Sequence, residues 1–313
     1  MLKKYAYKKI ALSTIALLIL AILYLFPKSD KPLKIKNEIN YIKTNKAAIY
    51  LIDKNNYVAR TDIISNEKDT IEKAKYLLRC LIKESNEEIY IPYEFKAIIP
   101  KNTTINSITL DNGLLKIDFS KEFLNVSKDD EEKMIESIIF TLTSQENIKE
   151  IMIFVNGSIL NELPNSKKKL PSILDKSFGV NKIVDINNFK NTTQVISYYL
   201  NSTSEGYYYI PVTTVSNSED EKVKIIIDQL KSRPLEKTNL IGFLNANAEL
   251  KDYEILENNI NLSFNNYLFD DIKNNTILEE IKYAIGYSIN DTYGINKVSY
   301  LVDNKKIEEF IIN

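Results

Sequence analysis

The chain has 313 residues, of which 44% are hydrophobic and 27% charged, and its formal net charge is -1. These values are typical of a folded protein and exclude a generally basic nucleic-acid-binding protein. There is no histidine and only 1 cysteine, which excludes His-based nucleophilic catalysis, His-ligated metals and an internal disulfide. Most enzyme chemistry is therefore excluded, and we expect no catalytic, cofactor-binding or metal-binding residues and no cofactor.

The N-terminal segment is predicted to be a single-pass membrane anchor. Four lysines among the first nine residues precede an uncharged, mostly apolar run over residues 10–26. As a helix this run would be about 25 Å long, slightly less than the hydrocarbon thickness of a bilayer. Positive charge before the run favours a cytoplasmic N-terminus. We therefore expect a cytoplasmic stub and transmembrane anchor over residues 1–27, followed by an extracytoplasmic body.

Two other interpretations of this segment stay open. A cleaved signal peptide should have a shorter apolar region and a small-x-small cleavage site, whereas this run closes with Tyr24, Leu25, Phe26 and Pro27. A buried helix of a soluble core is disfavoured by the lysines directly before the run. Lipid attachment is not expected, because the single cysteine, Cys80, lies far inside the body. Its position on an apolar helix face favours a small core residue over a reactive thiol.

After a stalk over residues 28–44, the body contains an internal repeat with an offset of about 145 residues. Residues 47–52 resemble residues 195–200, and residues 148–157 resemble residues 295–304. The predicted elements between these ends follow the same order in both copies, which indicates duplicated modules and not a solenoid. The predicted boundaries are 45–160 for the first module, 161–190 for a linker and 191–313 for the second module.

The first module is predicted to contain two strands, a helix, a hairpin, a second helix and a final strand. Ile71, Ala74 and Leu78 recur at helical spacing, and Asp111-Asn112-Gly113 is a strong hairpin-turn signal. The expected ranges are 47–52, 57–64, 68–84, 104–110, 114–119, 128–145 and 150–155.

The second module is predicted to repeat this order, with a hairpin turn at Asn258-Asn259. The expected ranges are 195–200, 206–213, 219–231, 250–263 for the hairpin, 275–290 and 297–302. Each module is therefore predicted to have an α+β fold, with two helices packed on one face of a small mixed or antiparallel sheet. The linker contains Pro164, Pro171 and the triplet Lys167–Lys169, which is typical of a solvated segment. Contact of the triplet with anionic lipid or wall polymer is the less favoured interpretation.

Three groups of acidic residues are candidates for chemistry, and each has a structural explanation. Asp118 corresponds to Asn261 in the second copy, and Asn cannot act as an acid or base, so a turn or capping role is favoured. The run Asp129–Glu132 falls in the first turn of a predicted helix, where the helix dipole favours acidic side chains. Asp270-Asp271 could bind Ca²⁺, but the spacing matches no calcium-binding loop.

The chain has 20 tyrosines, some of which lie together at Tyr198-Tyr199 and Tyr207–Tyr209 on predicted strands. Strand propensity explains most of this clustering. Because side chains alternate between the two faces of a strand, not every ring of Tyr207–Tyr209 can enter one core. Ordinary sheet packing is favoured, a protein interface is the second interpretation, and stacking on cell-wall sugars is the third.

Several segments of the first module resemble the GerMN domain of the sporulation and spore germination family. They are Tyr50–Asp53, Ile98–Thr103, Leu115–Phe123, Phe140–Thr143 and Ile151–Gly157, which follow the order and spacing of the family. The resemblance covers residues 47–157 and is weaker in the second module, where Ile260–Ser263 replaces Ile117–Ser120. The sequence therefore resembles a tandem GerMN protein, although it lacks the lipid-attachment cysteine of the lipoprotein members.

This resemblance implies a non-enzymatic, membrane-anchored scaffold that acts in spore formation or germination. It implies protein–protein contacts with other sporulation envelope proteins, self-assembly into a ring, and support of a channel or ring-like complex between mother cell and forespore. The implied location is the intermembrane space of the developing spore, with the chain held in the membrane by residues 10–26. The alternative from another class is a protein that binds or remodels the peptidoglycan of the cell wall. Nucleic acid is not an expected partner.

Overall fold

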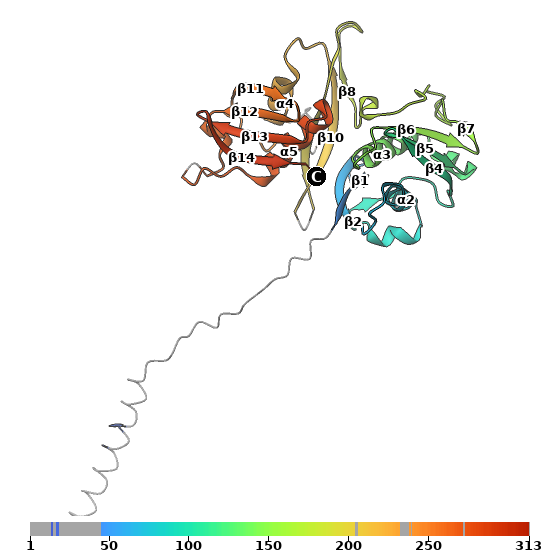
Figure 1. Ribbon diagram of the computed structural model, residues 1–313, viewed down its shortest axis with the longest axis horizontal. Helices are drawn as coiled ribbons and strands as arrows, with labels where there is room; N and C mark the ends of the chain where they lie inside the picture. Colours follow the sequence, from blue (N-terminus) through green and yellow to red (C-terminus); the bar gives the residue numbers. More distant parts are fainter. Residues whose placement is uncertain are drawn as a thin grey trace, which may run out of the picture. The chain divides into compact units, whose positions relative to one another are not determined.

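The computed structural model describes residues 45–203, 206–231, 238, 240–271 and 273–312, together with Thr14, Leu17 and Leu18. Apart from those three residues, the predicted anchor over residues 10–26 and the predicted stalk over residues 28–44 lie outside the described residues. Within the described part of the chain, no helix is long and apolar enough to cross a membrane. Residues 44–313 form one compact unit, in which Figure 1 colours the first repeat blue to green and the second yellow to red.

The first repeat contains every predicted element, with ends that differ by a few residues, and several short elements that the sequence did not indicate. Its elements are β1 (Lys46–Asp53), β2 (Val58–Ile64), α2 (Thr70–Leu81), a 3-10 helix (Asn86–Tyr90), β3 (Phe95–Lys96), β4 (Ile105–Asp111), β5 (Leu114–Phe119), a 3-10 helix (Lys121–Leu124), α3 (Glu131–Thr143), β6 (Glu150–Val155) and β7 (Ser158–Ile159). The β4–β5 turn places Asn112 and Gly113 at φ values of 49° and 89°, a region that Asn and Gly tolerate.

The second repeat has the same order of main elements. They are β9 (Thr193–Ser202), β10 (Tyr207–Ser216), α4 (Lys222–Leu230), β11 (Leu250–Leu256), β12 (Asn259–Phe264), α5 (Glu279–Tyr293), β13 (Lys297–Val302) and β14 (Lys305–Ile311), preceded by a 3-10 helix (Lys176–Phe178) and β8 (Ile183–Asp185). Strand β14 was not predicted. The β11–β12 turn consists of Glu257 and Asn258, one residue earlier than predicted, because Leu256 pairs with Asn259.

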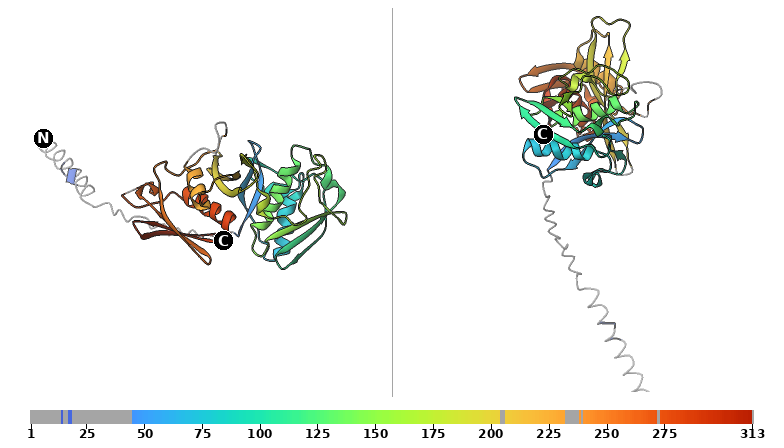
Figure 2. Two further views of the ribbon diagram at one scale, coloured as in Figure 1. Left: turned by 90° about the horizontal axis from the view of Figure 1, so that it is seen from above. Right: turned by 90° about the vertical axis from the view of Figure 1, so that its right-hand side faces the viewer.

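The strands form three sheets, so the prediction of one sheet per module is wrong. The central sheet has the order β3-β1-β2-β10-β8, and β9 pairs with β10. Both repeats therefore contribute strands to the same sheet. The outer sheets have the orders β4-β5-β6-β7 and β11-β12-β13-β14. The helices of each repeat lie between the central sheet and the outer sheet of that repeat (Figure 2), and α3 contacts both β1 and β6.

The burial of β1 explains why a single sheet per module fails. Ile49, Tyr50 and Leu51 are consecutive, so their side chains lie on both faces of the strand. All three are almost completely buried. A sheet with helices on one face alone would leave the other face of β1 in water, which suits an alternating pattern and not a continuous apolar run. The hydrophobic core around β1 extends into the second repeat, where it includes Tyr198 and Ile210.

The segment over residues 161–190 is packed against both repeats, in contrast to the expected solvated linker. Its apolar side chains Leu163, Leu170, Leu174 and Val180 are buried. The backbone of Leu174 pairs with Ile151 of β6, and β8 adds a parallel strand to β10. This segment therefore protects the open edge of β6 and links the outer sheet to the central one. The triplet Lys167–Lys169 is exposed, and its ammonium groups form ion pairs with Glu162 and Glu132.

Candidate functional site

The two repeats meet at the central sheet, and we call this region the junction. In each repeat, a helix residue there accepts a hydrogen bond from the unpaired edge of a strand. The backbone N–H of Tyr50 in β1 donates to Oγ1 of Thr141 in α3 at 2.9 Å. The backbone N–H of Tyr198 in β9 donates to Oγ of Ser288 in α5, also at 2.9 Å. Thr141 and Ser288 are fully buried. These hydroxyls satisfy strand N–H groups that would otherwise be buried without a partner.

The side chains of these two tyrosines, Tyr50 and Tyr198, also contact each other. The hydroxyl oxygens of Tyr50 and Tyr198 lie 2.6 Å apart. The Tyr198 hydroxyl donates to the carboxylate of Asp291 in α5, so the proton between the two tyrosines comes from Tyr50. Ser144 lies at the repeat-related position of Asp291, and its hydroxyl is 3.4 Å from that of Tyr50. We call Ser144, Tyr50, Tyr198, Asp291 and Lys176 the junction network.

Charge within the junction network is confined to one ion pair. The side chain of Asp291 is 3% exposed, and the ammonium group of Lys176 contacts its carboxylate. Burial, and after it the charge of Asp291, raises the pKa of both Tyr50 and Tyr198 above the ordinary value of 10.0. The two hydroxyls therefore stay protonated at physiological pH. They act as hydrogen-bond donors between the repeats and not as bases or nucleophiles.

A second contact between the repeats closes the β1–β2 turn. The carboxylate of Asp53 accepts hydrogen bonds from the backbone N–H groups of Asn55 at 2.9 Å and Tyr57 at 2.8 Å. It also accepts one from the hydroxyl of Tyr208 in β10, at 2.7 Å. The ring of Tyr208 packs edge-on against Phe95, with 5.0 Å between ring centroids. Asp53 is buried, so these three donors replace the hydrogen bonds that its carboxylate would make to water.

A third contact is made where β2 and β10 meet. Pro211 in β10 has no N–H to offer a neighbouring strand. The side-chain amide of Asn181 lies at this point, and its Nδ2 donates to the carbonyls of Val58 and Pro211 at 2.8 Å each. Its Oδ1 accepts from the N–H of Val58 at 3.0 Å. The side chain of Asn181 thus connects two strands that share a single direct pair, Arg60 with Tyr209.

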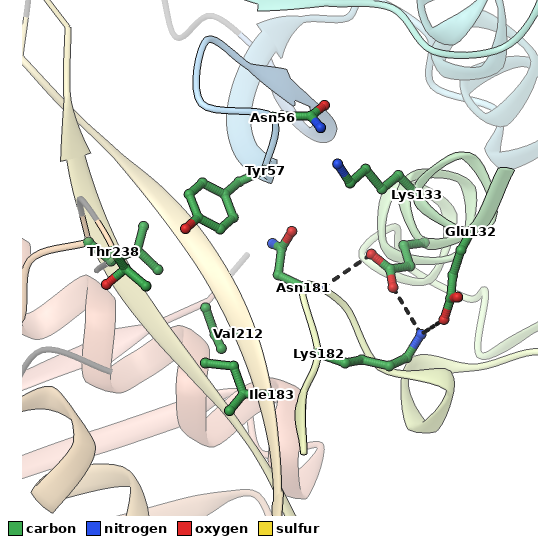
Figure 3. Close-up of a pocket in the computed structure, with 11 residues that line it drawn as sticks. Asn56, Tyr57, Glu132, Lys133, Asn181, Lys182, Ile183, Val212 and Thr238 are labelled. Atoms are coloured by element: carbon green, nitrogen blue, oxygen red, sulfur yellow. Dashed lines mark hydrogen bonds and ion pairs between the residues drawn. The ribbon is translucent and has the colours of Figure 1, made fainter. Parts of the chain in front are cut away.

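Beside Asn181 lies a pocket of about 430 Å³. Figure 3 shows Lys182 reaching toward two glutamates of α3 on one side of it. Its ammonium nitrogen is 2.6 Å from Glu132 and 2.9 Å from Glu136, and burial raises the pKa of Glu136. The charged groups closest to Asn181 in this pocket are thus engaged with each other. The lining is completed by Asn56, Tyr57, Lys133, Ile183, Val212, Thr238 and Leu240.

The carboxylates singled out from the sequence hold the backbone. Asp118 accepts a hydrogen bond from the N–H of Gly157 at 2.9 Å, which confirms a role in fixing the turn after β6. Asp271 accepts from the N–H of Lys273 at 2.8 Å and so closes a local turn. Among the residues that the structure describes, no group of three or more Cys, Asp or Glu side chains is placed to hold a metal ion. Cys80 is fully buried, as expected for a core residue.

The acidic run Asp129–Glu132 does more than complement the helix dipole. Glu131 is 1% exposed, and its carboxylate accepts hydrogen bonds from the N–H groups of Asn165 at 2.8 Å and Ser166 at 2.9 Å. It therefore anchors the segment that follows β7. The sequence held no local signal for this role, because the acceptor and its donors are more than 30 residues apart.

The clustered tyrosines divide between the core and the junction. Tyr198, Tyr199 and Tyr208 are buried, whereas Tyr207 is exposed. Tyr209 packs against the ring of Tyr287, with 5.4 Å between centroids. Most of these rings therefore serve packing, as favoured, and the interface they form is the one between the two repeats of this chain.

Comparison with known proteins gives consistent matches along the body. The family model described as sporulation and spore germination (Germane) matches residues 48–161. The spore germination protein GerM of Bacillus subtilis (strain 168) is 30% identical over 263 residues, covering 82% of this chain and 71% of that protein. The solved tandem GerMN domains of the sporulation protein GerM from Bacillus subtilis match with a TM-score of 0.76 and 28% identity, over 84% of this chain and 92% of that one.

Proposed function

Because the chain belongs to the sporulation and spore germination family and resembles the tandem GerMN domains of GerM, we propose that it is a non-enzymatic scaffold that acts through protein–protein contacts. The observation that carries this proposal is the extent of the match, which runs along 82% of the chain and so takes in both repeats. The proposal is also supported by the polar groups of the junction, which are engaged in holding the two repeats together.

The proposed setting is extracytoplasmic. The lysines before the apolar run over residues 10–26 favour a single-pass anchor with a cytoplasmic N-terminus. We propose residues 28–44 as a spacer and residues 45–160 and 191–313 as the two modules. Confinement to the space between mother cell and forespore raises the effective concentration of the body for envelope partners. In this setting the scaffold supports a channel or ring-like complex.

Deletion of the gene in its own host tests this proposal. The expected result is a clear fall in the number of heat-resistant spores, with a fluorescently tagged copy concentrated at the membranes between mother cell and forespore. A matched strain that lacks only codons 2–27 separates the role of the anchor from that of the body. Normal spore numbers together with an even distribution of the tagged protein around the cell would overturn the proposal.

The alternative of wall binding has one specific observation in its favour. Tyr93 and Phe189 are 99% and 94% exposed, and exposed aromatic rings can stack on sugars. Incubation of the protein with purified peptidoglycan, followed by sedimentation and assay of released sugar, distinguishes this function. Sedimentation that is lost in a Y93A/F189A variant would favour wall binding, and sugar release would favour remodelling.

A further inference from the structure

The outer edge of β4 is an open strand edge of the first outer sheet. The order β4-β5-β6-β7 places β4 at the end of that sheet, and no other strand of the described residues pairs with its outer edge. The opposite edge of the same sheet is covered by β7 and by the pairing of Ile151 with Leu174. An open edge presents unpaired N–H and C=O groups to any extended chain that fits it.

The register of the β4–β5 hairpin shows which groups point outward. Asp111 pairs with Leu114 across a two-residue turn, and Thr109 pairs with Lys116. These are the pairs that exchange hydrogen bonds, because such pairs alternate from the turn onward. The N–H and C=O groups of Ile108 and Leu110 therefore face away from β5. The side chains of these two residues pack against the core but remain half-buried.

The sequence of β4 carries few of the charges that usually protect an edge, and a bulge interrupts its pairing with β5 only at its start, between Ile105 and Ser107. Natural edge strands carry lysines, other charges or proline, whereas Asp111 is the single charged residue of β4 and lies at its end. The equivalent strand of the second outer sheet is β11, which has the same place in its sheet. It carries Lys251, Asp252 and Glu254. The same fold position thus has charged residues in the middle of the strand in one repeat and a charged residue only at the end of the strand in the other.

The pattern of β4 fits a second copy of itself. In an antiparallel pair centred on Ile108, within the regular part of the strand that follows the bulge, Ser107 of one copy lies opposite Thr109 of the other. Ser–Thr pairs are favourable across strands, and no like charges meet. The same arrangement of β11 centred on Tyr253 would place Asp252 opposite Glu254, which is unfavourable. Pairing of β4 would also bury the remaining exposed surface of Ile108 and Leu110.

We propose that two copies of this chain associate through antiparallel pairing of their β4 strands. The contact is isologous, since each copy offers the same residues to the other. It therefore closes at two copies, and any larger ring must use a different surface. This inference stands apart from the proposed scaffold function, because a dimer through β4 is testable in the absence of any envelope partner.

The test measures the mass of the full chain in detergent micelles by light scattering, with the detergent contribution subtracted. The wild-type chain is expected to be a dimer. The S107K/T109K variant sets lysines opposite lysines and should raise the dimer dissociation constant by about tenfold or more. In the S107K/T109E variant, each introduced lysine faces an introduced glutamate of the other copy, so the dimer should return. Both residues are exposed, and circular dichroism checks that the variants fold.

The D252K/E254K variant in β11 is the matched control and should leave the dimer unchanged. A wild-type monomer would overturn the proposal, as would a dimer that S107K/T109K leaves intact. Failure of S107K/T109E to recover the dimer would overturn the proposed register and with it the self-pairing. A wild-type monomer that acquires mass only when other envelope proteins are added would assign the β4 edge to a foreign strand instead.

Discussion

The hydroxyl groups of Tyr50 and Tyr198 lie 2.6 Å apart across 148 residues of sequence, and each tyrosine has the same neighbours in its own repeat. The backbone N–H of each donates to a hydroxyl of a following helix. Each ring also packs against the ring of an equivalent helix residue, Phe140 at 5.5 Å and Tyr287 at 5.4 Å. The duplication thus places two copies of one local structure face to face.

Loss of the Tyr198 hydroxyl should destabilise the protein. The Y198F variant leaves the buried carboxylate of Asp291 without its tyrosine donor and Tyr50 without an acceptor. We expect the free energy of unfolding to fall by about 1–3 kcal/mol, measured by denaturant titration. Tyr199 supplies the matched control, because its hydroxyl is buried and has no hydrogen-bond partner among the residues that the structure describes. The Y199F variant should therefore be neutral or slightly more stable, and equal losses in both variants would contradict this account.

The hydroxyl that covers the edge of β1 should matter more than a neighbouring one on the same helix. The T141V variant keeps the shape of the side chain but leaves the N–H of Tyr50 without its acceptor, which should cost about 1–3 kcal/mol. Thr143 donates to the carbonyl of Ile139 one turn earlier, within its own helix. The T143V variant should cost much less. Thermal or denaturant unfolding measures both, and a larger loss in T143V would argue against the edge-covering role.

Asn181 should require its amide nitrogen and not merely its size. The N181D variant replaces the two hydrogen bonds to the carbonyls of Val58 and Pro211 with repulsion between oxygens. We expect a loss of at least about 2 kcal/mol in the free energy of unfolding. The control is N191D at an exposed residue with a similar positive φ, 53° against 46°. An N181D protein as stable as N191D would show that the amide does not join β2 to β10.

Cys80 should report unfolding and not act as a reactive thiol. Burial raises its pKa from 9.0 to about 12, so the unfolded chain loses the thiol proton at lower pH than the folded chain. The stability from this group is therefore complete below about pH 9 and is lost as pH rises toward 12. Native protein should react with thiol reagents at its unfolding rate, and C80A should lose less stability than wild type over this pH range. Rapid labelling of the native chain near neutral pH would contradict the prediction.

Local signals in the sequence predicted the helices and strands well, but they did not predict the pairings between residues that are far apart in the chain. The β4–β5 hairpin was predictable because Asn112 and Gly113 determine their own turn. The mixed central sheet was not, because β2 meets β10 through Arg60 and Tyr209, which are far apart in the chain. The role of Asn181 depends on the missing N–H of Pro211, a relationship that only the folded chain reveals. Glu131 was attributed to the helix dipole because its two N–H donors come from another segment.

The unequal pair Ser144 and Asp291 has a consequence for how the two repeats can change over time. A second carboxylate at residue 144 would face the first across two tyrosine hydroxyls, and Lys176 already forms an ion pair with the first. Related sequences should therefore have an acidic residue at only one of these two positions. Where the acidic residue lies in the first repeat, the lysine that pairs with it should have moved as well. The two repeats, although they arose by duplication, must therefore keep different residues at this pair of equivalent positions.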